Sequence, residues 1–365
     1  MLTSLACCLL AVLTDTERLE RTIAEASFKS GTNRYAVVTA KPDGSSWTVE
    51  RTLRLPSDFT LLLDGAHLTL APETYCNMFR SEGTTNVTLI GRNGATVDGG
   101  EYNGLSERNA GRDGRPPIWV NNLLLFANVR RFRVEGVRFV RQRWWALDFI
   151  GCSDGIIRKI DFLSHHVTVK KDGSRIDTVG ADYEGILVKN SDGIDLRVGC
   201  HDIFIDGVTG FCEDDCVALT CLRGKLEKEF LSKDADYAIR NVTVRNVRAD
   251  SLCSLVRLLA QDGCRMSGIV VDGVEDVGDG NTYQTGYARY GVRLGDAYLY
   301  GRRQAAAGEV TDITIRNVRS RAWECAVLLA GVADGVVIEN VTAQPECPKA
   351  VEDLRLFAEA TQAVR

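Results

Sequence analysis

Six short segments of the chain repeat one pattern, in which apolar and polar residues alternate and a small or polar residue precedes a valine. Alternation with a period of two predicts strands that turn one face to a core. An Asn or Gly before the valine favours a tight bend in the left-handed backbone region. The six copies are Phe132–Val137, Ile203–Val208, Val242–Val247, Ile269–Val274, Ile313–Val318 and Val336–Val341.

The spacing of these copies predicts a solenoid. The last two are 23 residues apart, and the earlier intervals of 71, 39, 27 and 44 residues fit one coil with an insertion or several coils. Repetition at this period without intervening helices is typical of a right-handed parallel β-helix. The irregular units and the lack of hairpin signals disfavour the alternatives, a β-sandwich or a propeller.

A second set of strands follows the same alternation, with the flanking apolar residues inward and the middle residue outward. Neighbouring coils of such a sheet lie about 4.8 Å apart. We therefore expect Arg257 and Arg293 to lie side by side on one face. The whole predicted outward column is Asp195, Ala218, Arg257, Arg293 and Leu328.

Ahead of the strands, residues 15–30 place Leu19, Ile23 and Ala26 at helical spacing, and Gly31 supplies a stop. We expect a single domain over residues 1–365, with this helix at about 15–30 and the coils at about 50–345.

Composition and charge exclude several classes of function. The net charge of −5 over 365 residues argues against a nucleic-acid partner. No apolar run reaches the roughly 18 residues of a membrane span. The apolar stretch at residues 5–13 has no preceding Lys or Arg and no clear cleavage site, which disfavours a signal peptide.

The twelve cysteines are scattered singly, without zinc-ligand spacing. They favour buried, reduced thiols in a cytoplasmic protein, with secretion as the alternative. We expect a monomer or a small homo-oligomer.

Two acidic turns each run into a short apolar strand. Asp192, in Asn190–Asp195, precedes Asp215 by 23 residues, so one coil would stack the two and bring Asp214 beside them. A cluster of like charges is costly unless a cation or a reaction uses it. Paired carboxylates are what cleavage of a glycosidic bond needs, one as acid and one as base. Ordinary turn chemistry and a Ca²⁺ site are the alternatives.

The two turns, Asn-Ser-Asp-Gly-Ile-Asp and Asp-Asp-Cys-Val-Ala, resemble the acidic motifs of glycoside hydrolase family 28, the polygalacturonases and related pectinases. The order and the one-coil separation match as well. Residues 55–66 and 94–99 resemble the family's opening coils, and residues 15–26 resemble the helix that caps many β-helix enzymes.

The resemblance implies roles for individual residues. Asp214 would be the general acid, and Asp192 and Asp215 would hold and deprotonate the water. Asn190 would orient the first turn, and Arg293 falls where the family has an Arg-Ile-Lys motif that grips the substrate.

The chain departs from the family at two points. No histidine stands near Leu252–Ser254, where the family has Gly-His-Gly, and Gly295 replaces the lysine of Arg-Ile-Lys. These departures put polygalacturonan in doubt as the substrate. Arg257 could take over as a substrate-binding donor, or it could form an ion pair with Asp195.

The leading hypothesis is an inverting glycoside hydrolase without metal or cofactor that acts on a pectin-type or other plant or microbial poly- or oligosaccharide. The alternatives are a Ca²⁺-dependent lyase, a fructan transferase or a non-catalytic β-helix that binds glycans. Trp144, Trp145, Tyr183 and the tyrosine-rich residues 283–300 are candidate sugar-stacking walls. Residues 225–233 are expected to be a solvated charged insertion.

Overall fold

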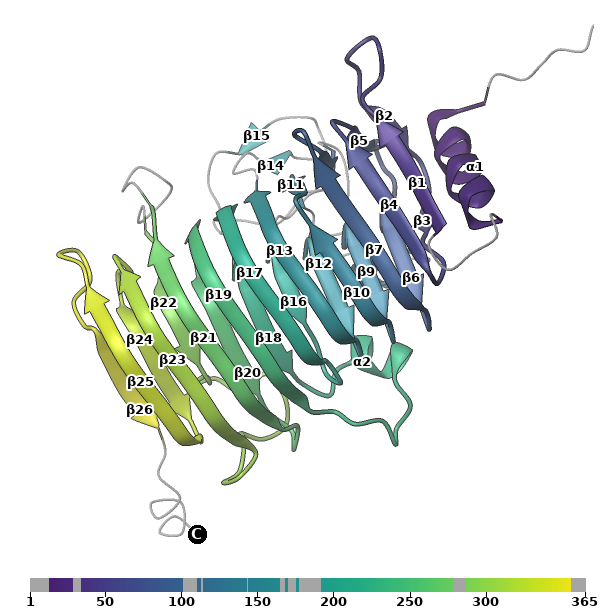
Figure 1. The fold of residues 1–365 in the computed structure, drawn as a ribbon. Helices are drawn as coiled ribbons and strands as arrows, with labels where there is room; N and C mark the ends of the chain where they lie inside the picture. The colour runs from purple at the N-terminus through teal and green to yellow at the C-terminus, as the bar shows by residue number, and fades with distance from the viewer. Residues whose placement is uncertain are drawn as a thin grey trace, which may run out of the picture.

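The chain forms a right-handed parallel β-helix, which confirms the predicted fold class (Figure 1). The structure is a computed structural model and describes residues 13–28, 34–100, 110–112, 114–142, 144–164, 168–169, 175–176, 192–278 and 287–355. Asn190, Tyr183 and Tyr283 lie outside the described residues.

A long sheet forms one wall of the solenoid, and each of its strands pairs in parallel with the next coil. Its main path is β1 (Arg34–Thr39), β4 (Phe59–Asp64), β7 (Thr85–Arg92), β10 (Arg130–Glu135), β13 (Ser153–Leu163), β17 (His201–Cys212), β19 (Ile239–Ser251), β21 (Met266–Asp276), β23 (Val310–Ser320) and β25 (Asp334–Ala343). Off this path lie β2 (Trp47–Val49), β5 (His67–Leu70), β8 (Thr96–Asp98) and β11 (Arg138–Val140).

A short sheet of parallel strands forms the opposite wall. Its strands are β3 (Leu53–Arg54), β6 (Phe79–Glu82), β9 (Leu124–Ala127), β12 (Leu147–Ile150), β16 (Ile194–Leu196), β18 (Val217–Cys221), β20 (Ser254–Ala260), β22 (Tyr290–Leu294), β24 (Cys325–Gly331) and β26 (Val351–Arg355). Two further short strands, β14 (Thr168–Val169) and β15 (Arg175–Ile176), pair antiparallel.

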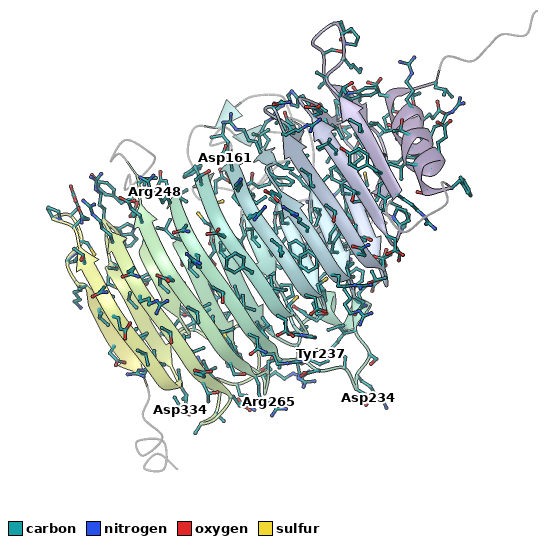
Figure 2. All side chains as sticks on the ribbon, viewed as in Figure 1. Asp161, Asp234, Tyr237, Arg248, Arg265 and Asp334 are labelled. Carbon is teal, nitrogen blue, oxygen red and sulfur yellow. The ribbon has the colours of Figure 1, made fainter. Side chains whose placement is uncertain are left out.

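The core lies between the two sheets and consists of stacked aliphatic and phenylalanine side chains. The predicted bend before each valine is present, because all six residues at that position have positive φ. Side-chain amides also bridge coils there: Asn317 donates to Asp272 over 2.7 Å, and Asn340 donates to Asn317 over 3.1 Å. Charged side chains such as Arg248 and Asp334 line opposite edges of the solenoid (Figure 2).

Helix α1 (Asp15–Ser27) covers the N-terminal end of the solenoid, next to β1. Its buried face carries Leu19, Ile23 and Ala26, as the spacing predicts, and Thr14 with Glu17 forms a capping box. The 3₁₀ helix η1 (Ile118–Asn121) and helix α2 (Lys225–Phe230) interrupt the coils. Within the described residues no helix has the length and apolar character needed to cross a membrane.

Candidate active site

The register of the short sheet brings the two acidic turns together as predicted. Ile194 of β16 pairs with Val217 of β18, which sets Asp192 against Asp215 one coil away. The amide of Asp215 donates to Asp192 Oδ1 over 3.2 Å, and the amide of Gly193 donates to the carbonyl of Asp215 over 2.9 Å. The backbone itself therefore fixes the spacing of the two carboxyl groups.

These carboxyl groups open into a cavity of about 480 Å³, a size suited to a small ligand or a few sugar rings. Asp192, Asp214 and Asp215 all line it. Asp192 and Asp215 are buried, whereas Asp214 is half-buried. The other lining residues are Ile118, Trp119, Trp144, Trp145, Arg197, Thr220, Leu222, Gly224, Lys225, Leu226, Glu227, Arg257, Leu259 and Tyr300.

The carboxyl groups differ in their surroundings. Burial raises the pKa of Asp192 well above its ordinary range, and nearby carboxylates raise it further. Burial and the neighbouring carboxylates therefore favour the protonated form of Asp192. Asp215 has the partners that stabilise negative charge, since it accepts the Ser254 amide over 3.1 Å and Arg257 Nη1 over 3.4 Å. We call Asp192, Asp214, Asp215 and Arg257 the cavity cluster.

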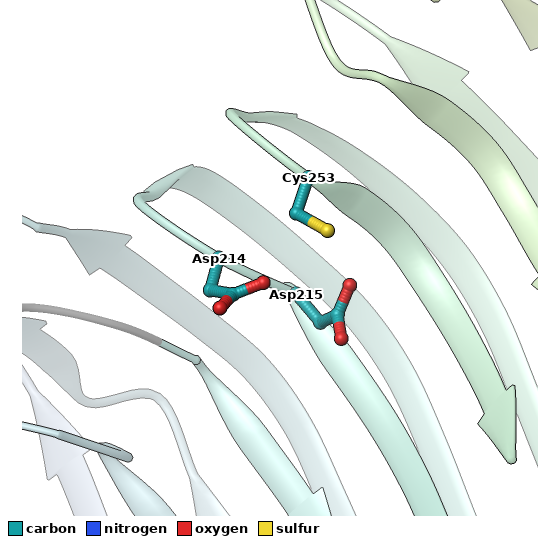
Figure 3. A group of neighbouring side chains, drawn as sticks. All are labelled: Asp214, Asp215 and Cys253. Atoms are coloured by element: carbon teal, nitrogen blue, oxygen red, sulfur yellow. The ribbon is translucent and has the colours of Figure 1, made fainter. Parts of the chain in front are cut away.

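Cys253 lies where the resemblance places a histidine, and it joins the acidic residues (Figure 3). One ligand atom each of Asp214, Asp215 and Cys253 lies within 4.8 Å of the others. Burial raises the pKa of the Cys253 thiol, and the two carboxylates raise it further. A protonated thiol is a poor metal ligand, and Ca²⁺ requires six to eight oxygen ligands. By themselves, these three residues offer two carboxylates and a thiol, which is fewer oxygen ligands than a Ca²⁺ site uses.

The two arginines lie side by side as predicted, because Arg257 of β20 pairs in register with Arg293 of β22. Arg257 lines the cavity, but Arg293 is 5 % exposed and is not among the lining residues. The predicted contact of Arg293 with substrate therefore has no direct route in this structure. The suggested ion pair between Arg257 and Asp195 is also wrong, since Arg257 contacts Asp215 and Asp296 instead.

A second charged group lies beside the cavity cluster, beneath helix α2. Glu227 of α2 accepts two hydrogen bonds from Arg197, the shorter over 2.6 Å, and Arg197 Nη1 lies 3.8 Å from Asp195 Oδ1. Asp148 accepts the Asn122 amide over 2.7 Å. All of these side chains are buried. We call Asp148, Asp195, Arg197 and Glu227 the helix-covered cluster.

The expectation of a solvated face over residues 225–233 holds for most of the segment, including its three lysines, but two residues of α2 correct it. Leu226 and Glu227 are buried, and Leu226 packs with Leu125 and Ile150 of the preceding coils. The six-residue helix thus closes the outer face of the short sheet on the N-terminal side of the acidic turns.

Aromatic side chains form part of the cavity wall. Trp144 and Trp145 stack with their ring centroids 3.7 Å apart, and Arg197 lies 4.6 Å from the Trp145 ring. On the other side Tyr300 covers Arg257 at 4.8 Å. The sequence identified the two tryptophans and the tyrosine as candidates, but it gave no signal for Trp119.

A larger hollow of about 620 Å³ lies beside α1, but it gathers no cluster of acidic residues. Its arginines, Arg54 and Arg80, both pair with Glu82. The cavity at the acidic turns is therefore the better candidate for chemistry.

Comparison with known proteins places this fold among β-helix enzymes and adhesins. No protein-family model matches the chain, and no curated protein matches its sequence. A polygalacturonase from Erwinia carotovora ssp. carotovora is similar in structure, with 14% identity, a TM-score of 0.56 and coverage of 93% of this chain and 94% of that one.

An exopolygalacturonase from Thermotoga maritima has 14% identity and a TM-score of 0.53, over 89% of this chain and 88% of that one. PfbA, a surface adhesin of Streptococcus pneumoniae, has 13% identity and a TM-score of 0.51, over 94% of this chain and 76% of that one. At these identities the likeness shows the shared parallel β-helix and not a shared activity.

Proposed function

We propose that the protein is a glycoside hydrolase whose catalytic groups are the three aspartates of the cavity cluster. The observation that carries the proposal is the convergence of Asp192, Asp214 and Asp215 on one ligand-sized cavity. Glycosidic bond cleavage requires a protonated and an ionised carboxyl group in one site, and a crowded set of carboxyls supplies both.

Asp214 is the general acid in this proposal, as the resemblance of its turn implies, and as the least buried of the three it is the one most open to a glycosidic oxygen. It protonates the glycosidic oxygen as the bond from that oxygen to the anomeric carbon breaks, and the leaving sugar departs as an alcohol. Asp215 takes a proton from water, which attacks the anomeric carbon from the opposite face. Asp192 holds this water and the Asp215 backbone in place. Asp215 then releases the proton it took to solvent, and solvent returns a proton to Asp214, so that both groups regain their starting states.

The spacing of Asp214 and Asp215 bears on whether the reaction inverts or retains the anomeric configuration. A carboxylate oxygen of Asp214 lies within 4.8 Å of one of Asp215. Inverting enzymes typically separate their carboxyls by about 6.5–9.5 Å, and retaining ones by about 5–5.5 Å. The anomer released first by the enzyme therefore tests the mechanism directly.

The experiment is a screen of purified oligosaccharides for release of reducing ends, followed by proton NMR of the fresh product. Hydrolysis with an inverted anomer supports the full proposal. A product with retained anomeric configuration still supports a hydrolase, but one in which a carboxylate and not water is the first nucleophile. An unsaturated product points to a lyase, and binding without turnover points to a glycan-binding protein; either of these outcomes rejects the hydrolase.

A further inference from the structure

Asp296 binds both arginines of the outward column from within the protein. Its Oδ2 lies 3.0 Å from Arg257 Nη2 and 2.6 Å from Arg293 Nη2. Its Oδ1 accepts the Tyr298 amide over 2.9 Å. The Asp296 side chain is fully buried, so it is a permanent counter-ion and not a group that solvent or substrate displaces freely.

The positive charges of both arginines are therefore largely neutralised within the protein, so they attract a negatively charged substrate only weakly. Arg257 already faces two carboxylates, those of Asp215 and Asp296. Arg293 is shielded from the cavity and lies 5.1 Å from the Tyr290 ring. Arg197, which also lines the cavity, forms an ion pair with Glu227. A carboxylate on the substrate would add a negative charge to an acidic cavity whose arginines are already paired.

The backbone also excludes a lysine side chain at position 295, two residues after Arg293. Gly295 follows Arg293 by two residues and adopts φ +72°. A Cβ there would lie 1.9 Å from the carbonyl oxygen of Ala330. The lysine that the resemblance leads one to expect cannot be accommodated at this position without moving the chain.

We propose that this cavity selects uncharged sugars over uronic acids, and that Asp296 is the residue that sets this specificity. The inference rests on the proposed function for its site and names the substrate class. A neutral glycan can use the edge of Arg257 and the carboxylates through its hydroxyl groups, and it can pack its rings against the aromatic wall.

Lys225 is the one lining cation, among the described residues, for which no ion pair is found, and it is exposed at the rim. Solvent screens a charge at such a position, so we expect it to contribute little discrimination. Lys225→Met separates its contribution from that of Asp296.

The test uses pairs of oligosaccharides that share length, linkage and ring stereochemistry and differ only in charge. Uronic-acid oligosaccharides and the same molecules after reduction of each carboxyl to a primary alcohol form such pairs. Binding is measured by calorimetry on the Asp214→Asn protein, in which we expect slow hydrolysis, across galacturonate, glucuronate and mannuronate series. We expect at least one neutral member to bind, at least about tenfold more tightly than its acidic partner.

Asp296→Asn removes the counter-ion and keeps the shape of the side chain. Introduced into the same Asp214→Asn protein, it should narrow the ratio of affinities for the neutral and the acidic member by about tenfold, because the positive charge of Arg257 is then less neutralised. Asp276→Asn is the matched control, since Asp276 is also buried but contacts neither arginine through any described ion pair. It should leave the ratio unchanged.

Equal or tighter binding of any acidic member than of its neutral partner overturns the proposal, as does failure of every neutral member to bind. The comparison of neutral with acidic oligosaccharides needs only the protein that retains Asp296. The proposal therefore remains testable if Asp296→Asn does not fold. Hydrolysis is followed separately. Hydrolysis of a uronic-acid oligosaccharide would reject the proposed specificity but support the proposed hydrolase activity. Binding of neutral oligosaccharides without hydrolysis would support the specificity but reject the hydrolase activity.

Discussion

The outer face of the short sheet carries two clusters of the same composition that differ in access. The cavity cluster and the helix-covered cluster each contain three carboxyl groups and one arginine on neighbouring coils. Helix α2 covers Asp148 and Asp195, which do not line the cavity, although Arg197 and Glu227 of the same cluster reach the cavity wall. The three aspartates of the cavity cluster all line the cavity. An outward column of charged residues therefore does not by itself define a site. The segments that cross the sheet decide which carboxylates can meet a substrate.

Shifted pKa values do not distinguish the cavity cluster from the helix-covered cluster. Burial raises the pKa of Asp192 in the cavity cluster, and it raises the pKa of Asp148 in the helix-covered cluster to about 8. Unusual pKa values are thus a property of this whole face, and accessibility is the feature that distinguishes a candidate catalyst from a structural carboxyl.

The sharpest way to break the comparison is to exchange one carboxyl for an amide in each cluster. Asp214→Asn should reduce kcat on the best substrate by about 10²–10⁴-fold, because the leaving oxygen loses its proton donor. Steady-state kinetics measure the loss, and circular dichroism confirms the fold.

The matched variant is Asp148→Asn, which should keep kcat at pH 7 within about threefold, because Asp148 does not line the cavity. Equal losses in the two variants would remove the functional distinction between the clusters. Full activity of Asp214→Asn would reject the assignment of the acid.

A second prediction concerns the stability supplied by the helix-covered cluster. Glu227→Gln leaves Arg197 buried without its closest carboxylate and should lower the free energy of unfolding by about 3 kcal/mol. Urea denaturation measures the change.

The double variant Arg197→Met with Glu227→Leu removes both charges and should recover most of that loss, because an apolar pair can replace a buried ion pair. If the single variant is as stable as the wild type, the buried cluster does not hold α2 against the sheet.

The third prediction uses pH. The pKa of Asp148 in the folded chain, about 8, is above its value in the unfolded chain, so the folded state binds this proton more tightly. Its stabilising contribution is complete below about pH 4 and is lost as the pH rises through about 8. Asp148→Asn should reduce the fall of unfolding free energy over this range by roughly 1.4 kcal/mol per pH unit.

The slope should not vanish in Asp148→Asn, since burial also raises the pKa values of Asp192 and Asp195. Asp154→Asn is the control, because Asp154 is exposed on the long sheet and should leave the slope as it was. A slope in Asp148→Asn equal to that of the wild type would mean that Asp148 does not hold its proton in the folded protein.

Much of the geometry followed from local pattern. The six bends before valine and the one-coil offset of Asp192 and Asp215 are properties of a repeating unit, so alternation and spacing were enough to predict them. The side-by-side position of Arg257 and Arg293 followed from the same register.

The features that escaped prediction depend on contacts between distant segments. Residues 225–230 are rich in charge and short, and the burial of Leu226 among them depends on Leu125 and Ile150, which belong to much earlier coils. Asp296 lies beyond the end of β22, and its position under both arginines depends on the left-handed turn at Gly295. A single sequence gives no signal for either contact.

The smallest expected effect tests what stabilises the charge of the cavity cluster. If Arg257 does so and no metal ion takes part, EDTA followed by added Ca²⁺ should change the rate by less than about twofold. Cys253→Ser keeps a small polar group beside Asp214 and Asp215, and it should change kcat/KM by less than about tenfold, which is about 1.4 kcal/mol in the barrier. A large loss with EDTA, restored by Ca²⁺, would make the cavity cluster a metal site, and the two clusters would then differ in their counter-ion as well as in their access.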